Sequence, residues 1–274
     1  MGEIWWIGRQ EFTLNRRNRW VLSFSGLFSI LTLLIAYFGM VTSGYAGFQD
    51  FTRTAASIVN LAGFLIPLFA LLLGVFSFTS NTEYLELLAT QPLPRSRVLL
   101  GKYLGLVMTV LGASIVGFGL PGIVIALVIG PVGAFSYLIV IGYSLLLALV
   151  FTGISVLISL LSGRTQLSVG IALGVWILFE VVFGVVMLGT TLYLTPDALQ
   201  IVLIGGLLGN PIDTVRVLSL LQVGGVHLFG PGGATLIKLT GSVTVASLIG
   251  LFGMTLWAAV PVLLSMRVFK RLDL

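Results

Sequence analysis

The feature that most constrains this chain is a run of 61 residues, from Tyr103 to Gly163, that contains no Asp, Glu, Lys or Arg. A helix that crosses a bilayer needs about 20 apolar residues, so this run must hold more than one span. Gly130-Pro131-Val132-Gly133 interrupts the run and predicts a tight turn between two spans. Only 8% of the whole chain is charged, against about 25% in soluble domains. The sequence therefore predicts an integral membrane protein.

The hydropathy pattern predicts one all-α transmembrane domain over residues 1–274, and each expected span is long enough to cross a bilayer. The six spans are expected at about 20–41, 58–80, 103–129, 135–161, 167–192 and 242–266. Residues 1–19 combine tryptophans with arginines, which predicts an interfacial elbow helix in the headgroup plane; an ordinary basic flank is the alternative. A cleaved signal peptide is not expected, because the first apolar segment is longer than an h-region.

The basic residues predict the orientation of the spans. With the N-terminus inside, 11 of the 14 Lys and Arg residues fall in inside segments. These are Arg9, Arg16, Arg17, Arg19, Arg95, Arg97, Lys102, Arg164, Arg267, Lys270 and Arg271, while Arg53, Arg216 and Lys238 fall outside. Cytoplasmic segments carry the excess of basic residues in membrane proteins, so both termini are expected in the cytoplasm.

The segment 193–241 is the one ambiguous region. Its apolar stretch, Ala198 to Gly209, has 12 residues and is too short to span a bilayer. Counting it as a span would also place the basic residues after the last span outside. We interpret it as an interfacial or re-entrant helix, followed by a second, amphipathic helix around 212–221 and a glycine-rich flexible loop.

Several kinds of chemistry are poorly supported by this sequence. It has no G-x-x-x-x-G-K-[ST] motif, so the chain is not expected to bind or hydrolyse ATP by that route. It has no cysteine, its single histidine is His227, and its six methionines are scattered, so no metal site is predicted. One histidine outside the spans cannot complete a hydrolytic triad. The net charge of +5 comes from membrane-boundary residues and does not indicate nucleic-acid binding.

Glu180 is the only charged residue deep within an expected span. A charge at the bilayer centre costs about 2.5–3.5 kcal/mol on insertion scales, so such a residue usually faces the protein interior or a water-filled cavity. Two interpretations stay open: a carboxylate of a substrate path or conformational switch, or a protonated side chain hydrogen-bonded to a neighbouring helix or to its twin in a dimer. Gly170 and Gly174 have the small-xxx-small spacing of close helix contacts, which makes this span a candidate subunit interface.

The polar segment from Asn81 to Tyr103 lies between two long apolar segments. It begins with a short amphipathic run, Glu83 to Leu88, continues through two prolines, and ends in a basic stretch. Such a run favours a helix that docks in a groove of a soluble partner, and a solvated loop is the alternative.

Leu85 to Lys102, LELLATQPLPRSRVLLGK, resembles the coupling-helix segment of ABC type-2 permeases, whose common form is close to E-x-G-T-L-E-L-L-L-S-x-P-[VL]-x-R-x-x-x-x-x-G-K. The residues that fit this form are Leu85, Glu86, Leu87, Leu88, Gln91, Pro92, Arg95, Gly101 and Lys102. The chain departs from it at Asn81-Thr82-Glu83-Tyr84, where the family usually has charged residues followed by Gly-Thr. Asn210 to Arg216 (NPIDTVR) and Gly170 to Glu180 resemble a narrower group, the NosY-like permeases of the nitrous oxide reductase maturation system.

The resemblance implies a homodimer in a prokaryotic plasma (inner) membrane, with a separate ABC ATPase subunit that supplies ATP and Mg²⁺. The residues implied in ATPase coupling are Glu83, Leu85, Glu86, Leu87, Leu88, Gln91, Pro92 and Arg95. In the narrower group a periplasmic accessory protein docks on the outside loops, and the complex serves copper-site assembly in the reductase. This implies a docking role for Asn210, Pro211, Asp213 and Arg216.

Three alternatives stay open for the role of the chain. The first is a general type-2 exporter of lipid, drug or ion, and the second is a membrane scaffold that moves nothing. The third, an ion-coupled secondary transporter, would normally show several intramembrane ionisable residues and internal repeats, rather than one glutamate.

Overall fold

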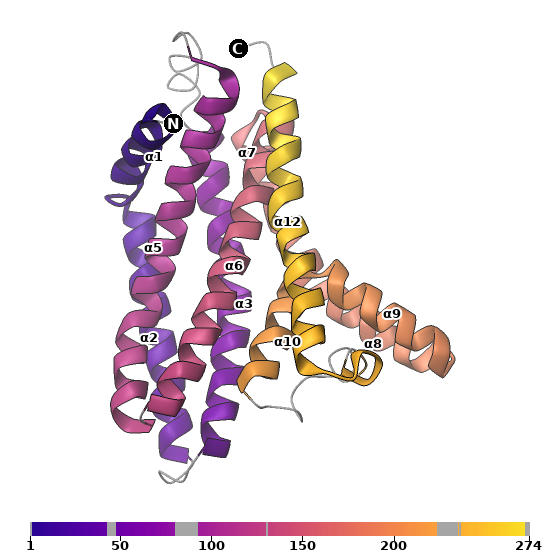
Figure 1. Cartoon of the computed structure of the whole chain (residues 1–274). Helices are drawn as coiled ribbons and strands as arrows, with labels where there is room; N and C mark the ends of the chain where they lie inside the picture. Colours follow the sequence, from indigo (N-terminus) through magenta and orange to yellow (C-terminus); the bar gives the residue numbers. More distant parts are fainter. Residues whose placement is uncertain are drawn as a thin grey trace.

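The computed structural model describes residues 2–42, 48–79, 93–129, 131–223, 235 and 237–271. All regular structure in these ranges is helical, which confirms the all-α fold (Figure 1). The helices are α1 (Gly2–Asn15), α2 (Arg19–Thr42), α3 (Phe48–Thr79), α5 (Arg95–Ile129), α6 (Pro131–Ser162), α7 (Thr165–Ile177), the π-helix η1 (Leu178–Val182), α8 (Phe183–Tyr193), α9 (Pro196–Gly209), α10 (Pro211–Val223) and α12 (Val243–Arg271).

The six expected spans are confirmed. Helical segments long and apolar enough to cross a membrane run over Arg19–Gly39, Thr54–Thr79, Arg95–Leu127, Ala134–Ser162, Thr165–Tyr193 and Val243–Arg271. The third extends furthest beyond its expected start, because α5 begins at Arg95 and carries the basic residues before Tyr103 within the helix. The fifth is composed of α7, η1 and α8 in succession.

The centre of the bundle is formed by α3 and α6, which are the most deeply buried of the spans. They approach closely where Gly74 of α3 faces Ser155 of α6, since any larger side chain at position 74 would overlap the serine hydroxyl. α2, α5 and α12 pack around this pair. The fifth span is the least buried, so most of its apolar surface faces away from its own chain.

The two ends of the chain lie at the same end of the bundle, where α1 begins and α12 finishes (Figure 1). The link from α6 to α7 is short: Gly163 takes a φ of +64° there, a conformation that glycine adopts without steric cost. This arrangement agrees with termini on one side of the membrane.

The two helices expected between the fifth and sixth spans are present as α9 and α10, and they meet at an angle of 99° at Asn210. α8 and α9 pack together and project from the side of the bundle (Figure 1). α10, however, is not an amphipathic surface helix: ten of its 13 residues are buried, and it packs against α3, α6 and α12. The pair is bent like a broken span or a re-entrant loop, and the re-entrant interpretation of residues 198–209 stays a prediction.

Candidate functional site

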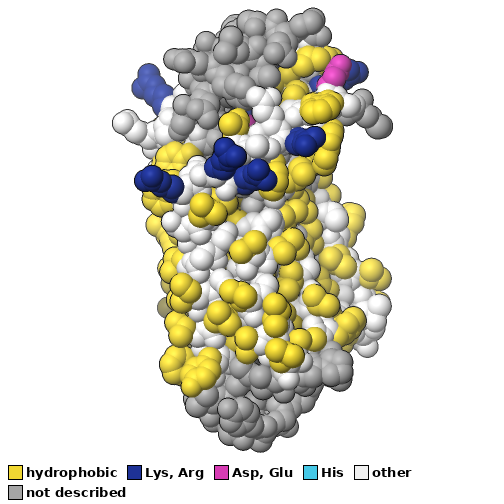
Figure 2. All heavy atoms as spheres, turned by 90° about the vertical axis from the view of Figure 1, so that its left-hand side faces the viewer, with side chains coloured by type: hydrophobic (Ala, Val, Ile, Leu, Met, Phe, Trp, Pro, Cys, Tyr) yellow, Lys and Arg dark blue, Asp and Glu magenta, His cyan; other side chains and the backbone are white. Residues whose placement is uncertain are grey.

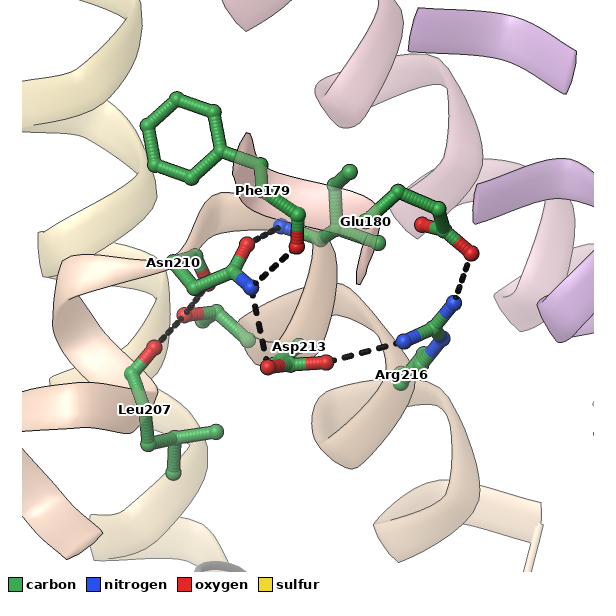
Figure 3. A network of polar contacts seen from close by, with 8 residues as sticks. Phe179, Glu180, Leu207, Asn210, Asp213 and Arg216 are labelled. Carbon is green, nitrogen blue, oxygen red and sulfur yellow. Dashed lines mark hydrogen bonds and ion pairs between the residues drawn. The ribbon is translucent and has the colours of Figure 1, made fainter. Parts of the chain in front are cut away.

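A network of polar side chains lies where the middle of the fifth span meets α10 (Figure 3). Arg216 of α10 donates from Nη2 to Glu180 Oε1 of η1 at 2.6 Å and from Nη1 to Asp213 Oδ1 at 2.9 Å. Asn210 donates from Nδ2 to the other Asp213 oxygen at 2.9 Å. One guanidinium therefore lies between two carboxylates that come from different helices.

The segment Asn210 to Asp213 has the residue types that begin a helix. Asn210 is the N-cap of α10, because its Oδ1 accepts a hydrogen bond from the backbone N–H of Ile212 at 2.9 Å. Pro211 occupies the first helical position, where its missing N–H has no consequence. Asp213 is the third helical residue, where a carboxylate is favoured by the helix dipole. The start of α10 thus explains why these residue types occur in the order N-P-x-D.

Asn210 also joins the two elements of the site. Its Nδ2 donates to the backbone carbonyl of Phe179 at 2.8 Å, and the residue is completely buried. Thr214 donates to the carbonyls of Leu207 and Asn210, so it closes the end of α9 against the start of α10. The sharp corner between the two helices is therefore held by side chains as well as by backbone.

Glu180 lies in a short π-helical turn, Leu178 to Val182, inside the fifth span. Such turns are rare and occur frequently at functional sites. Phe179 in the same turn has edge contacts with the rings of Phe151, at 6.0 Å between centroids, and Trp257, at 5.4 Å. The turn that carries Glu180 is thus anchored to α6 and α12.

The electrostatics of the network make it sensitive to disruption. The Glu180 and Arg216 side chains are 10% and 25% exposed. Within the described part of the chain, Glu180 Oε2 and Arg216 Nε are buried without a hydrogen-bond partner. A buried ion pair contributes little against an apolar alternative, but removing one partner is strongly destabilising. The network therefore holds the fifth span and α10 together through charged contacts.

Among the described residues no group of three or more His, Cys, Asp or Glu side chains could hold a metal ion. The polar side chains of the network are two carboxylates, a guanidinium, an amide and a hydroxyl, without a paired nucleophile and base. These groups join the fifth span to α10 through ion pairs and hydrogen bonds.

The structure brings together residues that the sequence assigns to two different places. The sequence predicts Glu180 at a transmembrane path or dimer interface, whereas it predicts that Asn210, Pro211, Asp213 and Arg216 dock an outside partner. Asn210 and Pro211 are buried, so their side chains present no surface to a partner in this structure. The docking role of this segment stays a prediction.

Gly170 and Gly174 are not part of this network. Both are exposed on α7, and a methyl group added at either would meet no other atom within 4 Å. This surface is therefore free to contact a second copy of the chain, and the predicted subunit interface stays a prediction.

Of the predicted coupling residues, Arg95 begins α5, and Glu83, Leu85, Glu86, Leu87, Leu88, Gln91 and Pro92 lie outside the described residues.

A second polar cluster is not predicted by the sequence. Glu11 of α1 pairs through Oε2 with Lys102 Nζ of α5 at 3.1 Å, and both side chains are almost fully buried. Glu11 Oε1 accepts hydrogen bonds from Ser77 of α3 at 2.6 Å and from Asn15 at 2.9 Å. We call Glu11, Asn15, Ser77 and Lys102 the Glu11 cluster. Its members are up to 91 residues apart, which is why no local pattern indicates it.

Glycines allow α1 to approach α5 closely enough for this pairing. A methyl group at Gly105 would overlap the carbonyl oxygen of Gly8, and one at Gly101 would lie 2.7 Å from Cβ of Ile7. Near the start of both helices, Arg97 forms an exposed ion pair with Glu3 at 2.7 Å. α1 is thus fixed along the first turns of α5.

The Glu11 cluster joins the two helices that flank residues 80–92. Ser77 is two residues from the end of α3 at Thr79, and Lys102 is seven residues after the start of α5 at Arg95. Glu11 contacts both, so the helix ends on either side of residues 80–92 are tied together through α1.

Comparison with known proteins gives consistent relatives along the whole chain. A family described as "ABC-2 family transporter protein" matches residues 5–274. The "Probable ABC transporter permease protein NosY" of Pseudomonas aeruginosa is 33% identical over 286 residues, which cover 99% of each chain. The protein of the same name from Stutzerimonas stutzeri is 34% identical over 284 residues, again with 99% of each chain covered.

Proposed function

This chain belongs to the ABC-2 family of transporter proteins and is a multi-pass membrane permease, and from that premise we propose that it serves copper-site maturation of nitrous oxide reductase. In this role it couples a separate ATPase subunit to transport or to mechanical signalling across the membrane. ATP and Mg²⁺ act in that partner, and two copies of this chain form the transmembrane dimer.

The observation that carries the proposal is the network around Arg216. The two segments that resemble the NosY-like group, Gly170 to Glu180 and Asn210 to Arg216, are 30 residues apart in sequence. Their characteristic charged residues meet in one network through the Arg216–Glu180 and Arg216–Asp213 contacts. The similar residues thus form a single structural unit, which supports membership of the narrower group beyond overall identity.

The Glu11 cluster supports the coupling part of the proposal. In ABC-2 permeases the segment after the second span meets the ATPase, and here that segment is flanked by the two helices that Glu11 joins. We infer that ATP-driven movement of residues 80–92 reaches the bundle through α3, α5 and α1 together. The half-buried Arg216 network would then respond inside the bundle, and the outside loops would pass the change to a periplasmic accessory protein.

The experiment compares the Glu86→Lys, Leu87→Asp double variant with wild type in cells that make the reductase. Lys270→Glu serves as the control, because it reverses a charge at an exposed residue near the end of α12, outside the coupling segment and outside the loops proposed to dock the accessory protein. Three quantities are measured: the amount of folded permease, ATP hydrolysis by the purified complex, and copper content of nitrous oxide reductase.

We expect the double variant to lose coupled ATP hydrolysis and to leave the reductase without its full copper content, while the control retains both. Loss of coupled hydrolysis with normally loaded reductase would overturn the copper role and favour the general exporter. Normal coupling in the double variant would contradict the coupling assignment itself.

A further inference from the structure

A cavity of about 510 Å³ opens where the corner between α1 and α2 meets α3 and α7. This size lies within the range of small-molecule sites, roughly 300–1,000 Å³. Its polar end is lined by Asn15, Asn18 and Ser77, and the rest by apolar side chains of α3 and α7 that include Phe69 and Leu173. From Phe69 to Ser77 the wall follows α3 for about 12 Å, at 1.5 Å rise per residue. The cavity is thus amphipathic along its length.

Basic residues adjoin the polar end of the cavity in sequence. Arg16, Arg17 and Arg19 surround Asn18 in sequence, all three are exposed, and no ion pair is seen for them within the described residues. None of the residues lining the cavity is acidic. On the side of the bundle that carries α1, Lys and Arg side chains form a band near one end, and hydrophobic and uncharged side chains cover the face below it (Figure 2).

The corner that presents these arginines is well defined. Asn18 caps the start of α2, because its Oδ1 accepts from the backbone N–H of Trp20 at 2.9 Å and its carbonyl accepts from Val21 at 3.0 Å. Trp20 lines the cavity and is 72% exposed. Tryptophan is enriched where acyl chains meet headgroups, so this side chain is suited to the membrane interface.

We propose that this cavity binds an anionic phospholipid of the cytoplasmic leaflet, with one acyl chain between α3 and α7 and the headgroup phosphate held by Arg16, Arg17 and Arg19. Three exposed guanidinium groups beside an amide-lined opening complement a phosphate, and the apolar walls complement an acyl chain. A zwitterionic lipid would make the same contacts with the apolar walls, but the three arginines would attract its headgroup less strongly.

The cavity lies next to the Glu11 cluster, so a bound lipid would affect that cluster. Asn15 and Ser77 line the cavity, and both donate hydrogen bonds to Glu11. A lipid bound here therefore contacts, at the polar end of the cavity, the side chains that hold Glu11 in place. If the proposed function holds, coupling between the ATPase and the bundle therefore depends on anionic lipid.

The test measures lipid binding to the full-length chain alone, so its result is independent of the proposed function. The chain is purified in mild detergent, incubated with an equimolar mixture of phosphatidylglycerol and phosphatidylcholine, and examined by native mass spectrometry. The variant is Arg16→Gln, Arg17→Gln, Arg19→Gln. The matched control, Arg267→Gln, Lys270→Gln, Arg271→Gln, removes the same charge at the same end of the bundle, on α12. Leu73→Trp, which fills the cavity and leaves the arginines in place, is a second variant.

We expect wild type and the α12 control to retain one phosphatidylglycerol per chain in preference to phosphatidylcholine. A basic residue at an anionic surface contributes about fivefold in affinity, so the arginine variant should lose at least about tenfold of this preference. Leu73→Trp should lose retention of both lipids. Equal loss in the α12 control, or undiminished preference in the arginine variant, would overturn the site. A separate measurement tests whether a second copy of the chain fills the cavity instead. Disulfide bonds between two chains that carry Trp20→Cys, together with no retained lipid, would overturn the proposal, because the cavity would then be occupied by the second copy.

Discussion

Replacement of Lys102 by Met is expected to destabilise the bundle far more than its position near a membrane boundary suggests. The Lys102 side chain is 1% exposed and the Glu11 side chain 5% exposed. Met retains most of the packing of the lysine stem but leaves the Glu11 carboxylate buried with two hydrogen bonds and without the cation. Removing one partner of such a pair costs about 3–5 kcal/mol.

The double variant separates this interpretation from simple loss of packing. Glu11→Gln alone leaves the Lys102 ammonium facing an amide oxygen and the ring of Phe78, 5.1 Å away, and should also cost about 3–5 kcal/mol. Glu11→Gln with Lys102→Met removes both charges and should be within about 2 kcal/mol of wild type, because a neutral replacement of a buried pair is often tolerated. The two single changes should therefore be strongly non-additive.

The assay is reversible unfolding of the purified chain in mixed micelles, monitored by tryptophan fluorescence for all four proteins of the cycle. Arg97→Met is the control, since the Arg97–Glu3 pair is 48% and 44% exposed and such pairs contribute about 0–1 kcal/mol. A cost below about 1 kcal/mol for Lys102→Met, or a double variant equal to the sum of the singles, would refute the reasoning.

Three further perturbations test the other contacts, the first two by unfolding in the same micelles. Arg216→Met should cost about 1–3 kcal/mol, because it leaves two half-buried carboxylates without their cation, and Glu180→Gln in the same chain should recover part of that loss. Asn210→Ala should cost about 2–3 kcal/mol, because it removes the cap of α10 and the bond to the π turn; an effect below about 0.5 kcal/mol would contradict this. Gly105→Ala should loosen α1 and expose it to proteolysis, whereas Gly119→Ala, which meets no atom within 4 Å, should not; equal digestion would be evidence against close packing.

Much of the fold can be predicted from the sequence, because the thickness of the bilayer sets the length of each apolar helix. Long apolar runs and the positions of basic residues are sufficient for six spans and for the shared side of the two ends. The helix break at Asn210-Pro211 is also readable, since both residues have strong preferences at helix starts. The amphipathic surface helix predicted after this break is wrong, because hydropathy does not distinguish a helix inside the bundle from one at its surface, and α10 is buried.

The candidate site can be predicted from the sequence only in part. Glu180 is recognisable as an isolated charge in an apolar span, and Arg216 as part of a motif, but their pairing depends on the corner between α9 and α10 that turns Arg216 inward. In the sequence, Glu11 is one of several charges on an expected interfacial helix. Nothing local distinguishes it from Glu3, although Glu11 is buried and Glu3 is exposed. The difference comes from Gly8, Gly101 and Gly105, whose effect depends on contact between separate segments.

The π turn from Leu178 to Val182 has a consequence for how this family can vary in length. A π turn holds one residue more than an α turn, so it is equivalent to a one-residue insertion absorbed within the helix. Deleting one residue there would restore a continuous α-helix and leave α8 facing the same way, so Met187 would keep its contact beside Gly206. Deleting one residue elsewhere in the span would instead rotate everything after it by about 100°. The π turn is therefore the place where the fifth span can lose one residue without repacking α8 against α9.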